Sequence, residues 1–201
     1  MTDVIAISVN GEVLENTYSV RAYADVILAD SAESDCHELV KKMLVYGGAA
    51  QTYFDYKTDN LASNGITVDA AVPTGAGEIA VTDNLGSIAF YGASLAHKTK
   101  TAVRFYFVGD IDGLTFTVDN TVYTPVLKDG MYYIEVGNIN PQALGAVLTV
   151  TVSDGTNSLI VGYSPLNYIV RMYEKQESSD ATKALAQALY GYYIAAAAYQ
   201  K

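Results

Sequence analysis

The sequence has little tryptophan, proline, histidine and cysteine. It contains no tryptophan, four prolines, two histidines and a single cysteine, Cys36, among 201 residues. One cysteine excludes a disulfide within the chain. A structural zinc site needs four Cys or His ligands. The chain has only one cysteine and two histidines, which argues against a zinc site. Large domains do not need disulfides, and their absence therefore assigns no compartment.

Positive charge and long apolar runs are also scarce. Twelve basic residues against 22 acidic residues give a net charge of −10, which repels nucleic-acid phosphates. No run reaches the roughly 18 apolar residues that a membrane helix requires. The start, Met1-Thr2-Asp3-Val4, lacks the basic and apolar segments of a signal peptide and leads directly into strand-like sequence. This beginning suits a domain excised without its signal peptide, but a cytoplasmic protein with its natural start would look the same.

Motifs for catalysis and cofactor binding are absent as well. There is no P-loop and no dinucleotide fingerprint, so we predict no catalytic residue and no cofactor. Cys36-His37 suggests a thiol nucleophile, but adjacent helical residues do not face each other. Asp110-Ile111-Asp112-Gly113 suggests a calcium loop, but lacks the further ligands of an EF-hand and fits a hairpin turn equally well. Because carboxylate spacing in glycosidases is three-dimensional, a hydrolase with an unrecognised carboxylate site stays as an alternative.

What the sequence does contain is an internal repeat. Residues 18–23 (YSVRAY) are similar to residues 163–168 (YSPLNY). Further on, a series matches in order: Leu39, Met43, Tyr46, Ala49, Ala50 and Tyr53 with Leu185, Leu189, Tyr192, Ala195, Ala196 and Tyr199. The repeat predicts two duplicated units, 4–54 and 148–199, each a hairpin followed by a short and a long helix. They flank a β region of about 78–161 within a single domain, 1–201.

The predicted helices have start signals and small-residue runs. Ser19 and Ser164 are typical N-caps, and Pro165 suits a first helical position. Asp35 followed by Glu38 predicts a capping box for the second helix. The runs Gly47-Gly48-Ala49-Ala50 and Ala195-Ala196-Ala197-Ala198 predict close packing of the long helices against neighbours. For the alanine run, helix propensity alone is an equal explanation.

Short alternating segments predict an antiparallel β-sandwich between the helical units. The Gly/Ala/Ser/Thr-rich stretch 61–77 is predicted to be a connector. The predicted strands are 87–95, 101–108, 114–118, 121–127, 131–136, 147–152 and 159–161, separated by turn residues such as Asp119-Asn120, Asp129-Gly130 and Asp154-Gly155. His97 is expected in a loop. The predicted fold class is therefore α+β, an antiparallel β-sandwich flanked by two duplicated helical hairpins.

The chain resembles a module that recurs in large secreted proteins of gut Clostridia such as ruminococci. The resemblance rests on YSVRAYADVIL, ELVKKMLVYGGAAQTYF and YKTDNLA, and later on FTVDNTVYTP, KDGMYYIEV, LTVTVSDG and YSPLNYIV. It covers nearly the whole chain and transfers no catalytic residue. It implies an extracellular, cell-surface or cellulosome-linked setting beside repeats, dockerins or carbohydrate-active domains.

Tyrosines are the strongest functional signal, since there are 17 of them. Strand alternation places Tyr91, Arg104, Tyr106 and Tyr133 opposite the core-facing residues of their strands. Such a face would stack sugar rings or seat a protein partner. Alternatively, the helices cover it and the tyrosines form a second core layer, which we expect somewhat more strongly.

The sequence therefore predicts a non-catalytic accessory module of a secreted multidomain bacterial protein, with a binding or spacer role at the cell surface. A glycan-binding module with a Tyr/Arg platform is the first alternative, and the hydrolase is the second. Expected partners are a glycan, a surface protein or neighbouring domains of the same polypeptide, and neither nucleic acid nor membrane.

Overall fold

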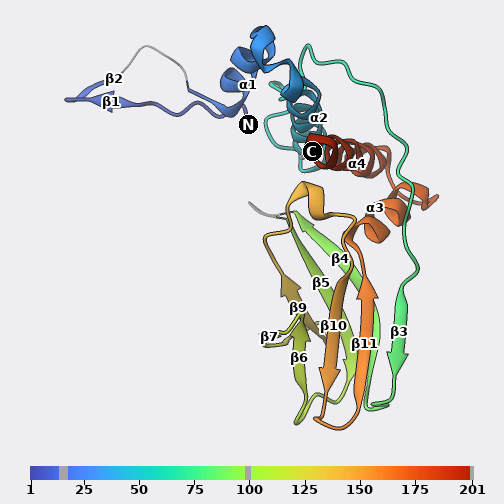
Figure 1. Cartoon of the computed structure of the whole chain (residues 1–201). Coiled ribbons are helices and arrows are strands. Elements are labelled where there is room, and N and C mark those ends of the chain that lie inside the picture. Colours follow the sequence, from blue (N-terminus) through green and yellow to red (C-terminus); the bar gives the residue numbers. More distant parts are fainter. Residues whose placement is uncertain (14–17, 98–100, 200–201) are drawn as a thin grey trace. The chain divides into compact units, whose positions relative to one another are not determined.

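A computed structural model describes residues 1–13, 18–97 and 101–199 (Figure 1). The fold is α+β, with helices and antiparallel sheets as predicted. The chain forms two compact units, whereas the sequence predicts a single domain. The helical unit comprises Met1–Pro73 with Met172–Lys201, and the sheet unit comprises Thr74–Arg171. Each unit is described separately below.

The described residues of the helical unit form one small hairpin, a 3-10 helix, three complete α-helices and the end of a fourth. Its elements are β1 (Ser8–Val9), β2 (Glu12–Val13), α1 (Val20–Ala29), the 3-10 helix η1 (Ser31–Cys36), α2 (His37–Tyr53), the end of α3 (Pro165–Glu174) and α4 (Asp180–Tyr199). Helices α2 and α4 pack side by side, and the rings of Tyr46 and Tyr192 stack between them at 5.9 Å. Within the described ranges, none of the helices combines the length and apolar character of a membrane span.

The start of α1 agrees with the prediction from the sequence, and the start of α2 differs from it. The Ser19 hydroxyl caps α1 by accepting from the backbone N–H of Ala22 at 2.9 Å, as predicted. The capping box at Asp35 was wrong, because α2 begins at His37 and its N-cap residue makes no side-chain cap bond. The chain instead enters α2 through η1, where Asp30 accepts from the N–H of Ala32.

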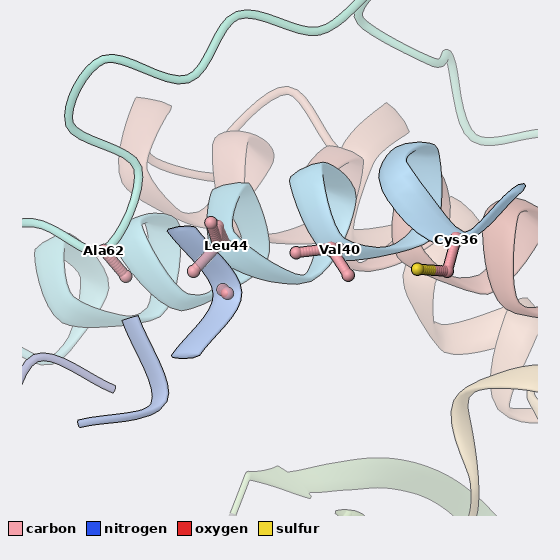
Figure 2. Packing of buried hydrophobic residues seen from close by; sticks show 5 residues of the cluster. Cys36, Val40, Leu44 and Ala62 are labelled. Carbon is pink, nitrogen blue, oxygen red and sulfur yellow. The ribbon is translucent and has the colours of Figure 1, made fainter. Parts of the chain in front are cut away.

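One apolar stripe of α2 forms the centre of the helical unit (Figure 2). Val40 and Leu44 of α2 continue a four-residue spacing that begins at Cys36, the last residue of η1, and the three side chains lie on the same side. Ala24 of α1 and Ala62 of the following segment pack against them. Ala62 is fully buried, so the predicted connector 61–77 begins as a packed part of the core.

The sheet unit consists of two antiparallel sheets. The first has the order β3-β11-β10-β6-β7 and the second the order β4-β5-β9-β8. The strands are β3 (Ala80–Asp83), β4 (Ile88–His97), β5 (Thr101–Gly109), β6 (Thr115–Val118), β7 (Thr121–Tyr123), β8 (Val126–Lys128), β9 (Met131–Val136), β10 (Leu148–Ser153) and β11 (Ser158–Tyr163). The short 3-10 helix η2 (Pro141–Ala143) follows β9. His97 is the last residue of β4, and its expected position in a loop was wrong.

Tight turns join neighbouring strands where the sequence predicts them. Asp119 and Asn120 both have positive φ, as do Asp129 and Gly130, and each pair closes a two-residue hairpin. This geometry is the type I′ turn, whose twist matches that of the flanking strands.

The predicted strand 121–127 is interrupted at Thr124-Pro125, after which the chain enters the other sheet. Proline has no backbone N–H and therefore favours such a break.

The two sheets face each other across a shared aromatic and aliphatic core. Phe107 of β5 meets Phe116 of β6 with ring centroids 5.4 Å apart, and Phe105 meets Tyr163 of β11 at 5.8 Å. All four side chains are buried. These contacts join strands of different sheets, so the unit has the sandwich-like arrangement that the sequence predicts.

The order of elements is compatible with the predicted repeat, which stays a prediction. Hairpin, short helix and long helix follow one another as β1-β2, α1 and α2, and again as β10-β11, α3 and α4. The hairpins differ, because β1 and β2 have two residues each while β10 and β11 belong to the five-stranded sheet. The helix α3 begins at Pro165, and the hydroxyl of Ser164 accepts from the N–H of Leu166 at 3.1 Å.

Candidate functional site

The outer face of the four-stranded sheet carries most of the predicted site residues. On β5, Phe105 and Phe107 are fully buried, while Arg104 and Tyr106 point to the other face and are partly exposed. The register then pairs Tyr106 with Tyr133 and Arg104 with Glu135 on the neighbouring β9. Paired residues of adjacent strands share a face of the sheet. The structure thus brings Arg104, Tyr106 and Tyr133 together.

Tyr91 joins this face through an irregularity in β4. The register shifts between Phe90 and Gly92, so that Tyr91 is the extra residue of a β-bulge. Gly92 lies opposite Tyr106, and the Tyr91 side chain is 69% exposed. The bulge also turns Ser94 outward, where its hydroxyl lies 3.2 Å from that of Tyr106.

The three central side chains form a connected cluster. The rings of Tyr106 and Tyr133 lie 5.9 Å apart with an interplanar angle of 44°. The guanidinium carbon of Arg104 lies 5.2 Å from the centroid of the Tyr133 ring. Arg104 Nε donates to Glu135 Oε2 at 2.8 Å, and this hydrogen bond raises the pKa of Arg104. The face therefore presents aromatic surface beside a fixed donor and acceptor pair.

Two residues of this cluster were not among the predicted site residues. Glu135 follows from the same alternation as Tyr133, so its signal was present in the sequence. Ser94 could be placed on this face only with knowledge of the bulge, because strict alternation from Phe90 would direct it inward. Arg104, Tyr106 and Tyr133 are partly exposed, and Tyr91 is highly exposed.

Cys36 and His37 have separate local roles. The Cys36 thiol is buried and donates to the carbonyl of Glu33 at 3.0 Å. Nε2 of His37 lies 2.9 Å from the carbonyl of Ile27 and 3.0 Å from that of Asp30. The imidazole therefore lies against two carbonyls at the end of α1 that also accept from the backbone N–H groups of Asp30 and Glu33. The two side chains form no nucleophile and base pair with each other in these contacts.

Asp110 and Asp112 lie in the turn after β5. The carboxylate of Asp110 accepts from the backbone N–H of Asp112 at 3.0 Å, the pattern of an Asx-turn. In the described ranges, no three side chains of His, Cys, Asp or Glu gather closely enough to hold a metal ion. The predicted turn is present, but it is not a hairpin turn, because it joins β5 to β6, which belong to different sheets.

Comparison with family models, with curated proteins and with solved structures gives no match for this chain. The candidate site therefore rests on its own geometry, which combines an exposed ring, a pair of partly exposed rings and an ion pair.

Proposed function

We propose that this chain is a non-catalytic accessory module of a secreted multidomain bacterial protein, and that it binds a neutral glycan through the outer face of the four-stranded sheet. The observation that carries the proposal is the cluster of Tyr106, Tyr133 and the pair formed by Arg104 and Glu135, with the exposed Tyr91 in the bulge of the neighbouring strand β4. No catalytic residue is assigned.

The chemistry of the face suits a sugar ring. The apolar C–H face of a pyranose stacks on an exposed aromatic ring, and burial contributes about 25 cal/mol per Å² of apolar area. Tyr91 is the most exposed of the three tyrosines, while Tyr106 and Tyr133 are partly exposed and their rings are tilted by 44° to each other. Arg104 donates and Glu135 accepts hydrogen bonds, so the pair can bind two neighbouring hydroxyl groups. The net charge of −10 favours a neutral glycan over an anionic one.

The Arg104 side chain provides a direct test. The experiment measures binding of the parent chain to a panel of plant and mucin glycans, followed by titration of each hit with Arg104→Met. We expect about tenfold weaker binding, because a charged hydrogen bond contributes roughly 1.5–3 kcal/mol. Arg171→Met is the matched control, since Arg171 also lies over a tyrosine ring, that of Tyr168, at 5.6 Å. The proposal would be contradicted if the parent chain bound no glycan, or if both variants lost the same amount of glycan affinity.

A protein-binding role is a second candidate, and it is supported by the exposed face of α1. Val20, Tyr23 and Val26 follow each other at three-residue steps and are each about half exposed or more. The hairpin residues Val9 and Val13 are exposed as well. Grouped apolar surface of this kind is typical of protein contacts, and it fits a module that binds a neighbouring domain or acts as a spacer.

We infer in addition that the segments 4–54 and 148–199 arose by duplication. The shared order of elements, the serine caps at Ser19 and Ser164 and the stacked pair Tyr46 and Tyr192, which occupy matching sequence positions, support this origin. An experimental structure tests it through superposition of residues 18–54 on residues 163–199. Different folds in the two segments would refute the duplication.

A further inference from the structure

The helical unit contains a pocket that is lined by residues of this unit alone. Its volume is about 330 Å³, and its walls come from α2, α4 and the segment 61–71. Val45, Leu61 and Val68 supply apolar surface, and most other positions carry small side chains. Pockets of this size with mostly apolar walls and few polar groups are typical small-molecule sites.

Glycines at the wall hold the three elements at close range. A Cβ atom on Gly48 would lie 2.2 Å from the Ser63 hydroxyl oxygen, so α2 approaches the segment 61–71 more closely than alanine would permit. A Cβ atom on Gly191 of α4 would lie 3.3 Å from Cδ of Lys42. Gly191 thus leaves room for the Lys42 side chain to lie across α4. The glycines explain how a charged side chain reaches the wall of this pocket.

Lys42 is the cation of the pocket, and it is nine-tenths buried. Its ammonium donates to the backbone carbonyl of Asp69 and lies 3.6 Å from a carboxylate oxygen of Glu38, which is largely exposed. An ammonium carries three N–H donors, so these contacts leave capacity for a ligand oxygen. A buried cation beside apolar walls selects for a compensating negative charge.

We propose that this pocket binds a small monocarboxylate with a compact apolar body. The carboxylate accepts from the Lys42 ammonium, in competition with the exposed Glu38, and the apolar body contacts Val45, Leu61 and Val68. The proposal concerns the helical unit alone and does not depend on glycan binding by the sheet unit.

Phenylacetate and its neutral counterpart phenylacetamide are the probes for this site. Titrations of the full chain, followed through the backbone amide signals of Gly48 and Gly191, give the two dissociation constants. We expect saturable shifts with phenylacetate, and binding of phenylacetamide that is weaker by about tenfold or more. Equal affinities for the two probes, or no saturable shift with phenylacetate, would overturn the proposal.

Two matched pairs of variants separate charge from space. Lys42→Met keeps the aliphatic stem and should weaken phenylacetate about tenfold without affecting phenylacetamide, while Lys41→Met, next to it on α2, should change neither. Ala49→Leu, at a half-buried position of the wall, fills the pocket and should abolish binding of phenylacetate, while Ala197→Leu on the exposed side of α4 should not. Melting temperatures identify any variant that fails to fold. Full affinity in a folded Ala49→Leu variant contradicts the pocket whatever the result for Lys42.

Discussion

Tyr106 and Tyr133 lie directly opposite each other on β5 and β9, with ring centroids 5.9 Å apart. The Tyr133 ring also lies next to the Arg104 guanidinium, which Glu135 holds at 2.8 Å. The cross-strand pairs of β5 and β9 therefore fix the ring positions and the ion pair together. Because both rings stay partly exposed, their contribution to stability should be smaller than that of the core rings on the same strand.

Tyr106→Ala should be much less destabilising than Phe107→Ala. A cross-strand aromatic pair contributes about 0.2–1 kcal/mol, whereas removal of a buried phenylalanine costs about 3–5 kcal/mol. Phe107 is fully buried and contacts Phe116 at 5.4 Å. Denaturant titration of both variants measures the difference in the free energy of unfolding. Similar losses for the two variants would mean that Tyr106 belongs to a core layer.

Gly48→Ala should destabilise the helical unit, although alanine is the better helix former. The new Cβ atom would lie 2.2 Å from the Ser63 hydroxyl oxygen and 2.7 Å from the Ser63 Cβ atom. Overpacking of this kind costs about 1–3 kcal/mol. The added variant Ser63→Gly removes both side-chain atoms and should restore part of the loss. A Gly48→Ala variant as stable as the parent would show that the segment 61–71 does not pack there.

The sequence predicted strands better than it predicted their irregularities. The strand 131–136 has the predicted bounds, because alternation and the turn at Asp129-Gly130 delimit it locally. The break at Pro125 and the bulge at Tyr91 were not predicted. Strand propensity continues through both positions, so it indicates neither the change of sheet at Pro125 nor the extra residue at Tyr91. β3 is fully exposed along its length and has no alternating pattern to detect.

The candidate site was predictable to the extent that it follows from alternation within strands. Arg104, Tyr106 and Tyr133 share a face for that reason. The pocket of the helical unit lay beyond sequence reasoning, because the contact of Lys42 with Asp69 depends on how the segment 61–71 folds back onto α2. The small residues of α2 indicated close packing, and Gly48 against Ser63 identifies the neighbour.

Alkaline pH should destabilise the sheet unit through Tyr163. Burial raises the pKa of Tyr163 to about 12, against 10.0 for an unperturbed tyrosine. Below pH 10 both the folded and unfolded states keep the proton, so stability is unaffected. Between pH 10 and 12 the unfolded chain loses the proton first, and stability falls by up to about 3 kcal/mol. Unfolding free energies at pH 9 and 11 should therefore differ less for Tyr163→Phe than for the parent.

An excess of EDTA should leave the melting temperature unchanged. The segment around Asp110 and Asp112 resembles a calcium-binding loop in sequence. Its Asp110 carboxylate forms a hydrogen bond within its own turn. A decrease of several degrees that calcium reverses would contradict this expectation and would assign a metal to that loop.

The central claim is that the outer face of the four-stranded sheet binds a neutral glycan, and Tyr91→Ala tests it most directly. Tyr91 is 69% exposed, so its removal should not change the melting temperature. Tyr23→Ala is the matched control, because Tyr23 is also 69% exposed but belongs to α1 of the helical unit. Isothermal titration with a glycan that the parent chain binds gives both affinities. We predict weaker binding for Tyr91→Ala by about tenfold or more and parent affinity for Tyr23→Ala; equal affinities for Tyr91→Ala and the parent would contradict the claim.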